Sequence, residues 1–143
     1  MRFDGRVHKA GRHWAIEVPI LGVASQGRSK RNAYGMIADA IESLVNRAGF
    51  RVVVHPGSGG YFEVGASDEA ALTAFLLRRT RLRAGLTLAE AAKRLGAKSL
   101  NAYARYEQGR AVPTVVKLSE LLAAVAPARD FVLSESRSRS SVP

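Results

Sequence analysis

The chain of 143 residues contains no cysteine. This absence excludes disulfide bonds and cysteine-based zinc sites, and it favours a reducing compartment. No apolar run approaches the roughly 20 residues that a transmembrane helix needs. The first residues also lack the apolar stretch of a signal peptide. Together, these absences predict a soluble, cytoplasmic protein.

Acidic residues are also scarce, because 12 Asp and Glu stand against 22 Lys and Arg, which gives a formal net charge of +10 at pH 7. A positive field attracts polyanions such as nucleic acid, anionic lipid or an acidic protein. The charge also fits a basic protein that is simply soluble, but it favours nucleic acid as the partner. Since 47% of the residues are hydrophobic, the chain can build a core.

Patterns of catalytic residues are missing from the first half. Asp39 and Glu42 share a helix face by their spacing, which is typical of a solvated surface. Glu17 and Glu63 fall at polar positions of alternating strands, where carboxylates are expected to face outward. The histidines are scattered and stand near no nucleophile pattern. We therefore expect no enzyme activity, no cofactor and no metal site.

The first half has the pattern of strands around one helix. Alternating or β-branched segments predict five strands, at residues 2–8, 13–18, 21–27, 50–55 and 61–66. Ser29 is the expected N-cap of a helix over residues 30–48, and Gly49 is its expected stop. The order β-β-β-α-β-β predicts a small antiparallel sheet covered by one helix.

From Ser67 onward, only helical patterns occur. They predict four helices, at about Ser67–Ala84, Leu88–Leu95, Ser99–Gln108 and Thr114–Val125. Thr87 and Glu90 form a capping box at the start of the second of these helices. The overall class is therefore α+β, with predicted domains at 1–67 and 68–134 and a disordered tail at 135–143.

The second-half helices follow the layout of a helix-turn-helix unit. In that layout the second helix of the pair, here residues 99–108, enters the major groove. Tyr103 and Tyr106 are three residues apart and are expected to face the core. The polar side is expected to meet DNA, because Asn and Arg read bases and Lys and Ser hold phosphates. The expected DNA-binding residues are Lys98, Ser99, Asn101, Ala102, Arg105 and Arg110.

By itself, this pattern also fits an ordinary four-helix cluster with a solvated polar side. The segment from about Arg78 to Val125, however, resembles the XRE/Cro-type helix-turn-helix family. The matching motifs are GLT at 85–87, AEAAKRLG at 89–96 and RYEQGRAVP at 105–113. The resemblance implies that Arg81 of the first helix pairs with Glu107, which closes the recognition helix. Both residues are therefore expected to be structural.

The whole chain except its tail resembles the HicB-like antitoxin family. The motifs that carry this resemblance are WAIEVPILGVASQG at 14–27, ADAIESLV at 38–45 and NAYARYEQGRAVP at 101–113. It implies a partial ribonuclease-H-like N-terminal domain that neutralises a small, mRNA-cleaving HicA-like toxin. It also implies a C-terminal domain that represses the operon of the pair, and a homo-oligomer, either a dimer or a tetramer.

Two other functions stay open at this point. One is a free-standing transcriptional regulator whose first half oligomerises or senses a ligand. The other is a protein-interaction module whose helical half does not read DNA. The basic start of the 30–48 helix departs from the HicB-like pattern, and cations at a helix N-terminus are unfavourable.

Overall fold

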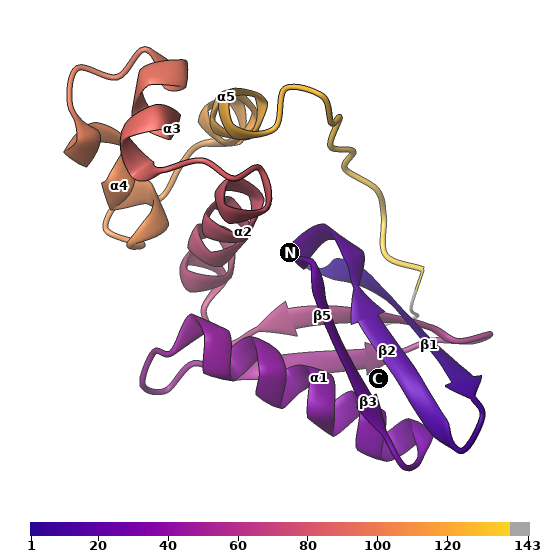
Figure 1. The fold of residues 1–143 in the computed structure, drawn as a ribbon. Coiled ribbons are helices and arrows are strands. Elements are labelled where there is room, and N and C mark those ends of the chain that lie inside the picture. Colours follow the sequence, from indigo (N-terminus) through magenta and orange to yellow (C-terminus); the bar gives the residue numbers. More distant parts are fainter. Residues whose placement is uncertain (138–143) are drawn as a thin grey trace. The chain divides into compact units, whose positions relative to one another are not determined.

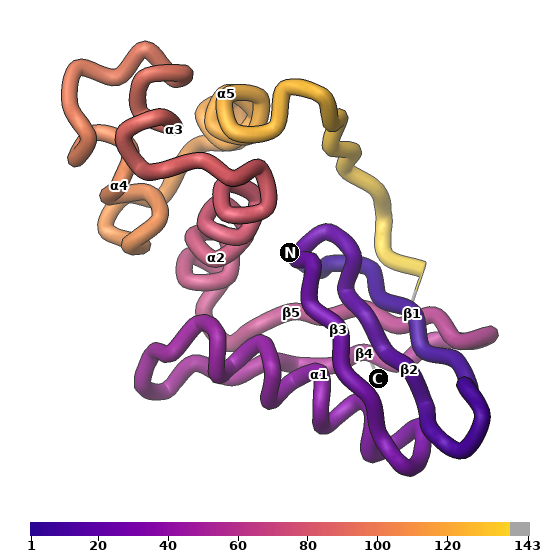
Figure 2. Tube along the Cα trace, viewed as in Figure 1, coloured from indigo at the N-terminus to yellow at the C-terminus, as the bar shows by residue number. Residues whose placement is uncertain are grey.

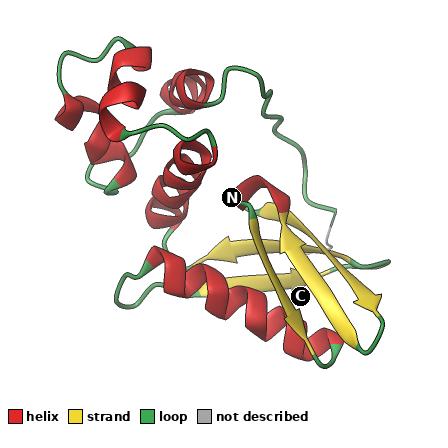
Figure 3. Cartoon of the chain, viewed as in Figure 1, coloured by secondary structure: helices red, strands yellow, loops and turns green. Residues whose placement is uncertain are grey.

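The computed structural model describes residues 1–137, and the chain divides into two compact units. The first contains Met1–Glu69 together with a C-terminal segment that starts at Ser134, and the second contains Ala70–Leu133. The sequence pattern placed the domain boundary after residue 67. Every strand of the described residues belongs to the first unit, and the second is helical (Figure 3). The predicted α+β class is confirmed.

The first unit is a five-stranded antiparallel sheet with one helix. Its strands are β1 Phe3–Ala10, β2 His13–Val18, β3 Val23–Gly27, β4 Val52–Pro56 and β5 Tyr61–Ala66. A short 3-10 helix, Pro19–Leu21, separates β2 from β3 and starts at a proline, which cannot donate a hydrogen bond to the sheet. The strand order is β3-β2-β1-β5-β4, so β1 and β5 pair in the centre although they lie far apart in sequence (Figure 1).

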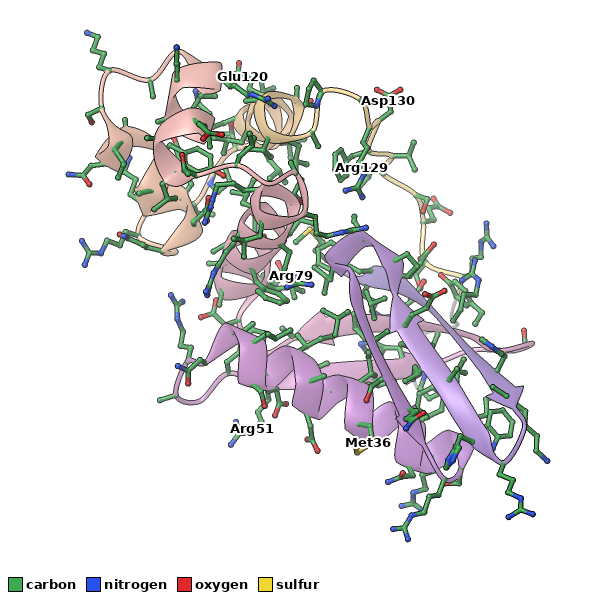
Figure 4. The ribbon with its side chains drawn as sticks, in the orientation of Figure 1. Met36, Arg51, Arg79, Glu120, Arg129 and Asp130 are labelled. Atoms are coloured by element: carbon green, nitrogen blue, oxygen red, sulfur yellow. The ribbon has the colours of Figure 1, made fainter. Side chains whose placement is uncertain are left out.

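Helix α1, Lys30–Val45, covers one face of this sheet (Figure 1). Ala33, Ile37 and Ile41 follow one another at a spacing of four residues and are fully buried. This spacing places them on the single apolar side of the helix that packs against the strands. Met36, labelled in Figure 4, lies on the outer side of α1 and is 40% exposed.

Cap residues set both ends of α1. The hydroxyl of Ser29 accepts a hydrogen bond from an N–H of the first turn, as predicted. The prediction that the helix continues to residue 48 was wrong. Asn46 adopts the left-handed conformation with a φ of 49°, which asparagine tolerates better than most residues, and its N–H bonds to the carbonyl oxygen of Glu42. Leu44, in the last turn of the helix, is 43% exposed.

The other face of the sheet is formed by the alternate residues of each strand, which point away from α1. Most of its polar side chains are exposed, among them those of Arg6, His8 and Glu17. The expectation that Glu63 faces outward into solvent was wrong, because Glu63 on β5 is only 2% exposed. Strand alternation gives the face on which a side chain lies, but it cannot give what covers that face.

Part of the cover over Glu63 comes from the C-terminal segment. The hydroxyl of Ser136 and the backbone N–H of Arg137 both donate to the Glu63 carboxylate. In Figure 2 the yellow end of the trace runs towards the strands. Ser136 and Arg137 of the expected disordered tail therefore contact the first unit, and they supply donors that a buried carboxylate needs. Residues 138–143 of that tail lie outside the described residues.

The second unit consists of four helices: α2 Glu69–Arg83, whose first residue belongs to the sheet unit, α3 Leu88–Leu95, α4 Leu100–Glu107 and α5 Val115–Val125. Helix α3 packs against both α4 and α5. Leu121 and Leu122 are buried, whereas Leu95 is only half-buried. This small core holds α3 and α4 at the positions from which the candidate site is built.

Candidate nucleic-acid interface

The turn between α3 and α4 is fixed by three local features of the sequence. Thr87 caps the start of α3, where its hydroxyl accepts the N–H of Glu90 at 3.1 Å. Gly96 ends α3 with a φ of 73°, a conformation that costs glycine little. Ser99 then caps α4, its hydroxyl accepting the N–H of Ala102 at 3.3 Å. The chain therefore makes a tight helix, turn and helix, as the sequence predicted.

One side of α4 belongs to the core of the helical unit. Tyr103 is fully buried and Ala104 is 3% exposed. They share this core with Ala91 of α3 and with Leu121 and Val125 of α5. Burial raises the pKa of the Tyr103 phenol, because an ionised phenolate would lose its hydration there.

An ion pair joins the C-terminal end of α4 to α2. The guanidinium of Arg81 donates to both carboxylate oxygens of Glu107, from Nε at 2.7 Å and from Nη2 at 3.0 Å. Its Nη1 donates to the carbonyl oxygen of Leu86 at 2.8 Å. The side chains of Arg81 and Glu107 are only 10% and 5% exposed. The hydrogen bond to Glu107 raises the pKa of Arg81. Because both side chains are buried, the pair lies inside the framework of the helical unit and away from its outer surface.

The other side of α4 faces outward. Asn101 and Arg105 are exposed and lie four residues apart, hence on the same side of the helix. Ala102 is half-buried at the edge of that side. Lys98 in the turn and Arg110 after the helix are also exposed. Ser99 is exposed as well, but its hydroxyl oxygen already caps α4. Of the six expected DNA-binding residues, all except Ala102 are therefore at the surface.

Tyr106 differs from its expected place in the core. It is only half-buried, and the guanidinium carbon of Arg105 lies 5.7 Å from the centre of its ring. A cation at this distance from an aromatic ring is attracted to the face of the ring. The tyrosine therefore restrains Arg105 at the surface, in addition to contributing to packing.

Two cations of α3 add to the charge of this surface, although they are not among the six residues predicted from the sequence. Lys93 and Arg94 are exposed in the last turn of α3. Because Glu107 is paired with Arg81, the exposed charges around α3 and α4 are mostly positive. The position of Lys93 and Arg94 as adjacent cations in the helix before the recognition helix could have indicated this role from the sequence. The exposed cations in residues 88–110 are Lys93, Arg94, Lys98, Arg105 and Arg110.

Comparison with known protein families matches residues 74–130 to a helix-turn-helix domain. The second unit carries a helix-turn-helix domain. The match spans α3, the turn and α4, and it supports the resemblance to the XRE/Cro-type family. It does not extend to the sheet unit, for which the HicB-like resemblance stays a prediction. No curated protein matches the chain. A helix-turn-helix domain is typical of a DNA-binding regulator.

The sheet unit contains the titratable residues that were considered for catalysis. Asp39 is exposed, and Glu42 accepts the backbone N–H of Val52 at 2.8 Å, which ties α1 to the start of β4. Burial, together with the charge of Arg2, lowers the pKa of His55. Within residues 1–137, no group of three or more His, Asp or Glu side chains is arranged to hold a metal ion. In the same range, no helix has the length and apolar character to span a membrane.

Proposed function

We propose that the protein is a sequence-specific DNA-binding transcription regulator whose helix α4 enters the major groove. The observation that carries this proposal is the division of α4 into a buried side with Tyr103 and Ala104 and an exposed side with Asn101 and Arg105. An α-helix with its side chains is about 10–12 Å wide, and the major groove is about 12 Å wide. The exposed side of α4 can therefore reach base edges without rearrangement of the core.

The exposed residues divide by chemistry into two groups. Asn101 can form a bidentate contact with adenine, and Arg105 can do so with guanine. Lys98 and Arg110, at the two ends of α4, can neutralise phosphates, as can the cations of α3. Since Tyr106 restrains Arg105, less side-chain freedom is lost when its guanidinium binds a base.

The test is binding to the DNA upstream of the protein's own gene, measured at several salt concentrations. Arg105→Ala should weaken binding to the specific site by about 1–3 kcal/mol, with a much smaller effect on unrelated DNA. Lys98→Ala is the matched comparison, because it also removes one exposed cation. It should weaken binding to all sequences alike and reduce the salt slope by about 1. If neither variant changes affinity, α4 is not the reading helix.

We further propose that the chain acts as a homo-oligomer, either a dimer or a tetramer, on a palindromic operator. Two copies of α4 would then read half-sites about 34–36 Å apart, one turn of DNA. Sedimentation of the protein with and without a two-half-site duplex tests this arrangement. Two copies per palindromic duplex are expected; one copy at saturating protein would refute the dimeric mode.

For the sheet unit we propose the role that the HicB-like resemblance implies, namely binding and neutralisation of a HicA-like toxin. Two features support a role separate from DNA reading: the sheet unit has its own core, and it lies outside the helix-turn-helix match. If the small protein encoded next to the gene is such a toxin, its expression alone should stop growth, and co-expression of this chain should restore growth. Arg105→Ala should still rescue, because it lies in the other unit. Failure of the wild type to rescue would reject the antitoxin role and leave the DNA-binding proposal intact.

A free-standing regulator whose sheet unit oligomerises or senses a ligand is the alternative. It shares the expected effect of Arg105→Ala on operator binding but needs no toxic neighbour. Operator binding without rescue would favour it. A chain that neither binds its upstream DNA nor shows sequence preference would instead favour a protein-interaction module.

A further inference from the structure

The face of the sheet that points away from α1 carries a buried carboxylate, that of Glu63. The proposed DNA-binding function does not use this residue. Glu63 receives hydrogen bonds from two side chains of the sheet: Arg2 donates from Nη1 at 3.2 Å, and the hydroxyl of Tyr61 donates at 2.5 Å. The C-terminal segment adds two more donors. Ser136 donates through its hydroxyl to Oε1, and Arg137 donates through its backbone N–H to Oε2 at 3.1 Å. Each carboxylate oxygen thus accepts one bond from the segment.

The aromatic ring of Tyr61 also contributes to the site around Glu63. The guanidinium carbon of Arg137 lies 5.7 Å from the ring centre, and that of Arg6 lies 5.1 Å from it. The phenol oxygen also lies 3.0 Å from a carboxylate oxygen of Asp4, so its single proton can be donated either to Glu63 or to Asp4. A cation over an aromatic ring is stabilised by the ring quadrupole, most strongly where water is excluded. The sheet therefore recognises three different groups of the segment: a hydroxyl, a backbone N–H and a guanidinium.

The sheet side of this arrangement comes from a part of the chain far from the segment. Arg2, Asp4, Tyr61 and Glu63 all lie on the central strands or next to them, with Asp4 directly opposite Glu63 in the β1–β5 pairing. The segment, in contrast, starts at Ser134 after the whole helical unit and has neither helix nor strand conformation. A site built on strands and filled by an extended segment is the geometry of a peptide-binding site.

We propose that this face is a binding site for an extended peptide with the sequence Ser-Arg, and that Ser136 and Arg137 of the same chain occupy it. The proposal does not rest on DNA binding. A second peptide could bind only if the segment leaves, because both would need the same oxygens of Glu63. A negative charge placed at Ser136 would release the segment, since it would stand within hydrogen-bond distance of a buried carboxylate.

The first test measures amide hydrogen exchange at Arg137 in the full-length protein. In the wild type, this N–H should exchange about tenfold or more slowly than that of Leu133, the factor expected for one charge-assisted hydrogen bond. Ser136→Asp should abolish the difference. Ser134→Asp is the matched control, because it adds the same charge two residues earlier, where the structure shows no contact with Glu63; it should retain the protection.

These variants change only the segment, so the sheet stays folded and every result decides the question. Equal protection in Ser136→Asp and Ser134→Asp would overturn the proposal. So would an Arg137 amide that exchanges as fast as that of Leu133 in the wild type.

The second test supplies the peptide from outside. A synthetic peptide with the sequence of residues 132–137, VLSESR, is added to full-length Ser136→Asp protein, whose own segment is released. Saturable shifts of the Tyr61 and Glu63 amide resonances are expected. The same peptide with Asp in place of the second serine is the control and should cause none. Identical responses to both peptides, or no response to either, would show that the face is not a Ser-Arg binding site.

Discussion

The two units of this protein each bury one glutamate, and they do so in different ways. In the helical unit, Glu107 is held by Arg81 in a bidentate ion pair whose two side chains are 10% exposed or less. In the sheet unit, Glu63 accepts a hydrogen bond from Arg2, whose side chain is 27% exposed, and further bonds from hydroxyl and backbone donors. The first glutamate is sealed by residues of its own helical motif. The second is sealed partly by a segment that follows the whole helical unit.

This difference indicates how much each carboxylate contributes to the stability of its unit. The Arg81–Glu107 pair connects three parts of the helical unit, since Arg81 also bonds to the carbonyl oxygen of Leu86. Loss of either partner leaves the other as a buried charge without its counter-ion. Arg2 is closer to water and can be rehydrated if Glu63 is lost. The helical unit should therefore be more sensitive to removal of its glutamate than the sheet unit.

The largest expected effect is that of Glu107→Ala. Removing one partner of a buried ion pair costs about 3–5 kcal/mol, because the remaining charge is uncompensated. Urea unfolding followed by the helical circular dichroism signal measures this loss. Glu90→Ala, at an exposed position of α3, is the control and should stay within about 0.5 kcal/mol of the wild type. A loss below about 1 kcal/mol for Glu107→Ala would mean that the pair does not hold the unit together.

Glu63→Ala should cost less, about 1–3 kcal/mol, the range for buried donors left without an acceptor. Trp14 on β2 is the only tryptophan of the chain, so its fluorescence reports unfolding of the sheet unit. Glu17→Ala, an exposed carboxylate on the same strand as Trp14, is the control. A cost for Glu63→Ala that exceeds the cost for Glu107→Ala would reverse the comparison between the two units.

A smaller effect of opposite sign is expected at Gly35, inside α1. A Cβ added there would meet no atom within 4 Å, and the residue is exposed. Gly35→Ala should therefore stabilise the sheet unit by about 0.5–1 kcal/mol through the reduced entropy of the unfolded chain. Gly27→Ala is the contrasting variant, because its Cβ would lie 2.4 Å from the backbone nitrogen of Ala33. The order of the two denaturation midpoints, Gly35→Ala above wild type and Gly27→Ala below, checks the packing of α1 on β3.

The smallest expected effect is a pH dependence from His55 of the sheet unit. Burial and Arg2 lower its pKa below the usual 6.5, while Glu63 opposes this shift. The unfolded chain then binds more protons, so stability from this group is present above pH 6.5 and decreases as the pH falls towards the lowered pKa. His55→Asn should lose less stability than the wild type between about pH 7 and pH 5.5.

Urea midpoints at those two pH values measure the difference, with His8→Asn, at an exposed position of β1, as the matched control. An identical pH dependence in His55→Asn and the wild type would show that His55 does not contribute.

Much of the fold could be predicted because it depends on local signals. Period-two and period-four patterns gave the strands and helices, and cap residues such as Ser29, Thr87 and Ser99 gave their starts. The end of α1 could not be predicted, because Asn46 stops the helix with its backbone before the glycine is reached. Local patterns also separated the buried Tyr103 from the exposed Arg105, but they could not show that Tyr106 lies under the guanidinium of Arg105.

The sequence by itself determined the order of the elements, the helix-turn-helix layout and the exposed polar side of α4, because each follows from neighbours within one or two helical turns. Tertiary structure alone decided that β1 pairs with β5 and that Glu63 is buried. Both depend on segments far apart in the chain. Glu63 accepts hydrogen bonds from Arg2, near the N-terminus, and from Ser136, 73 residues after Glu63. Periodicity describes the direction of a side chain, whereas its burial depends on which distant residues cover it.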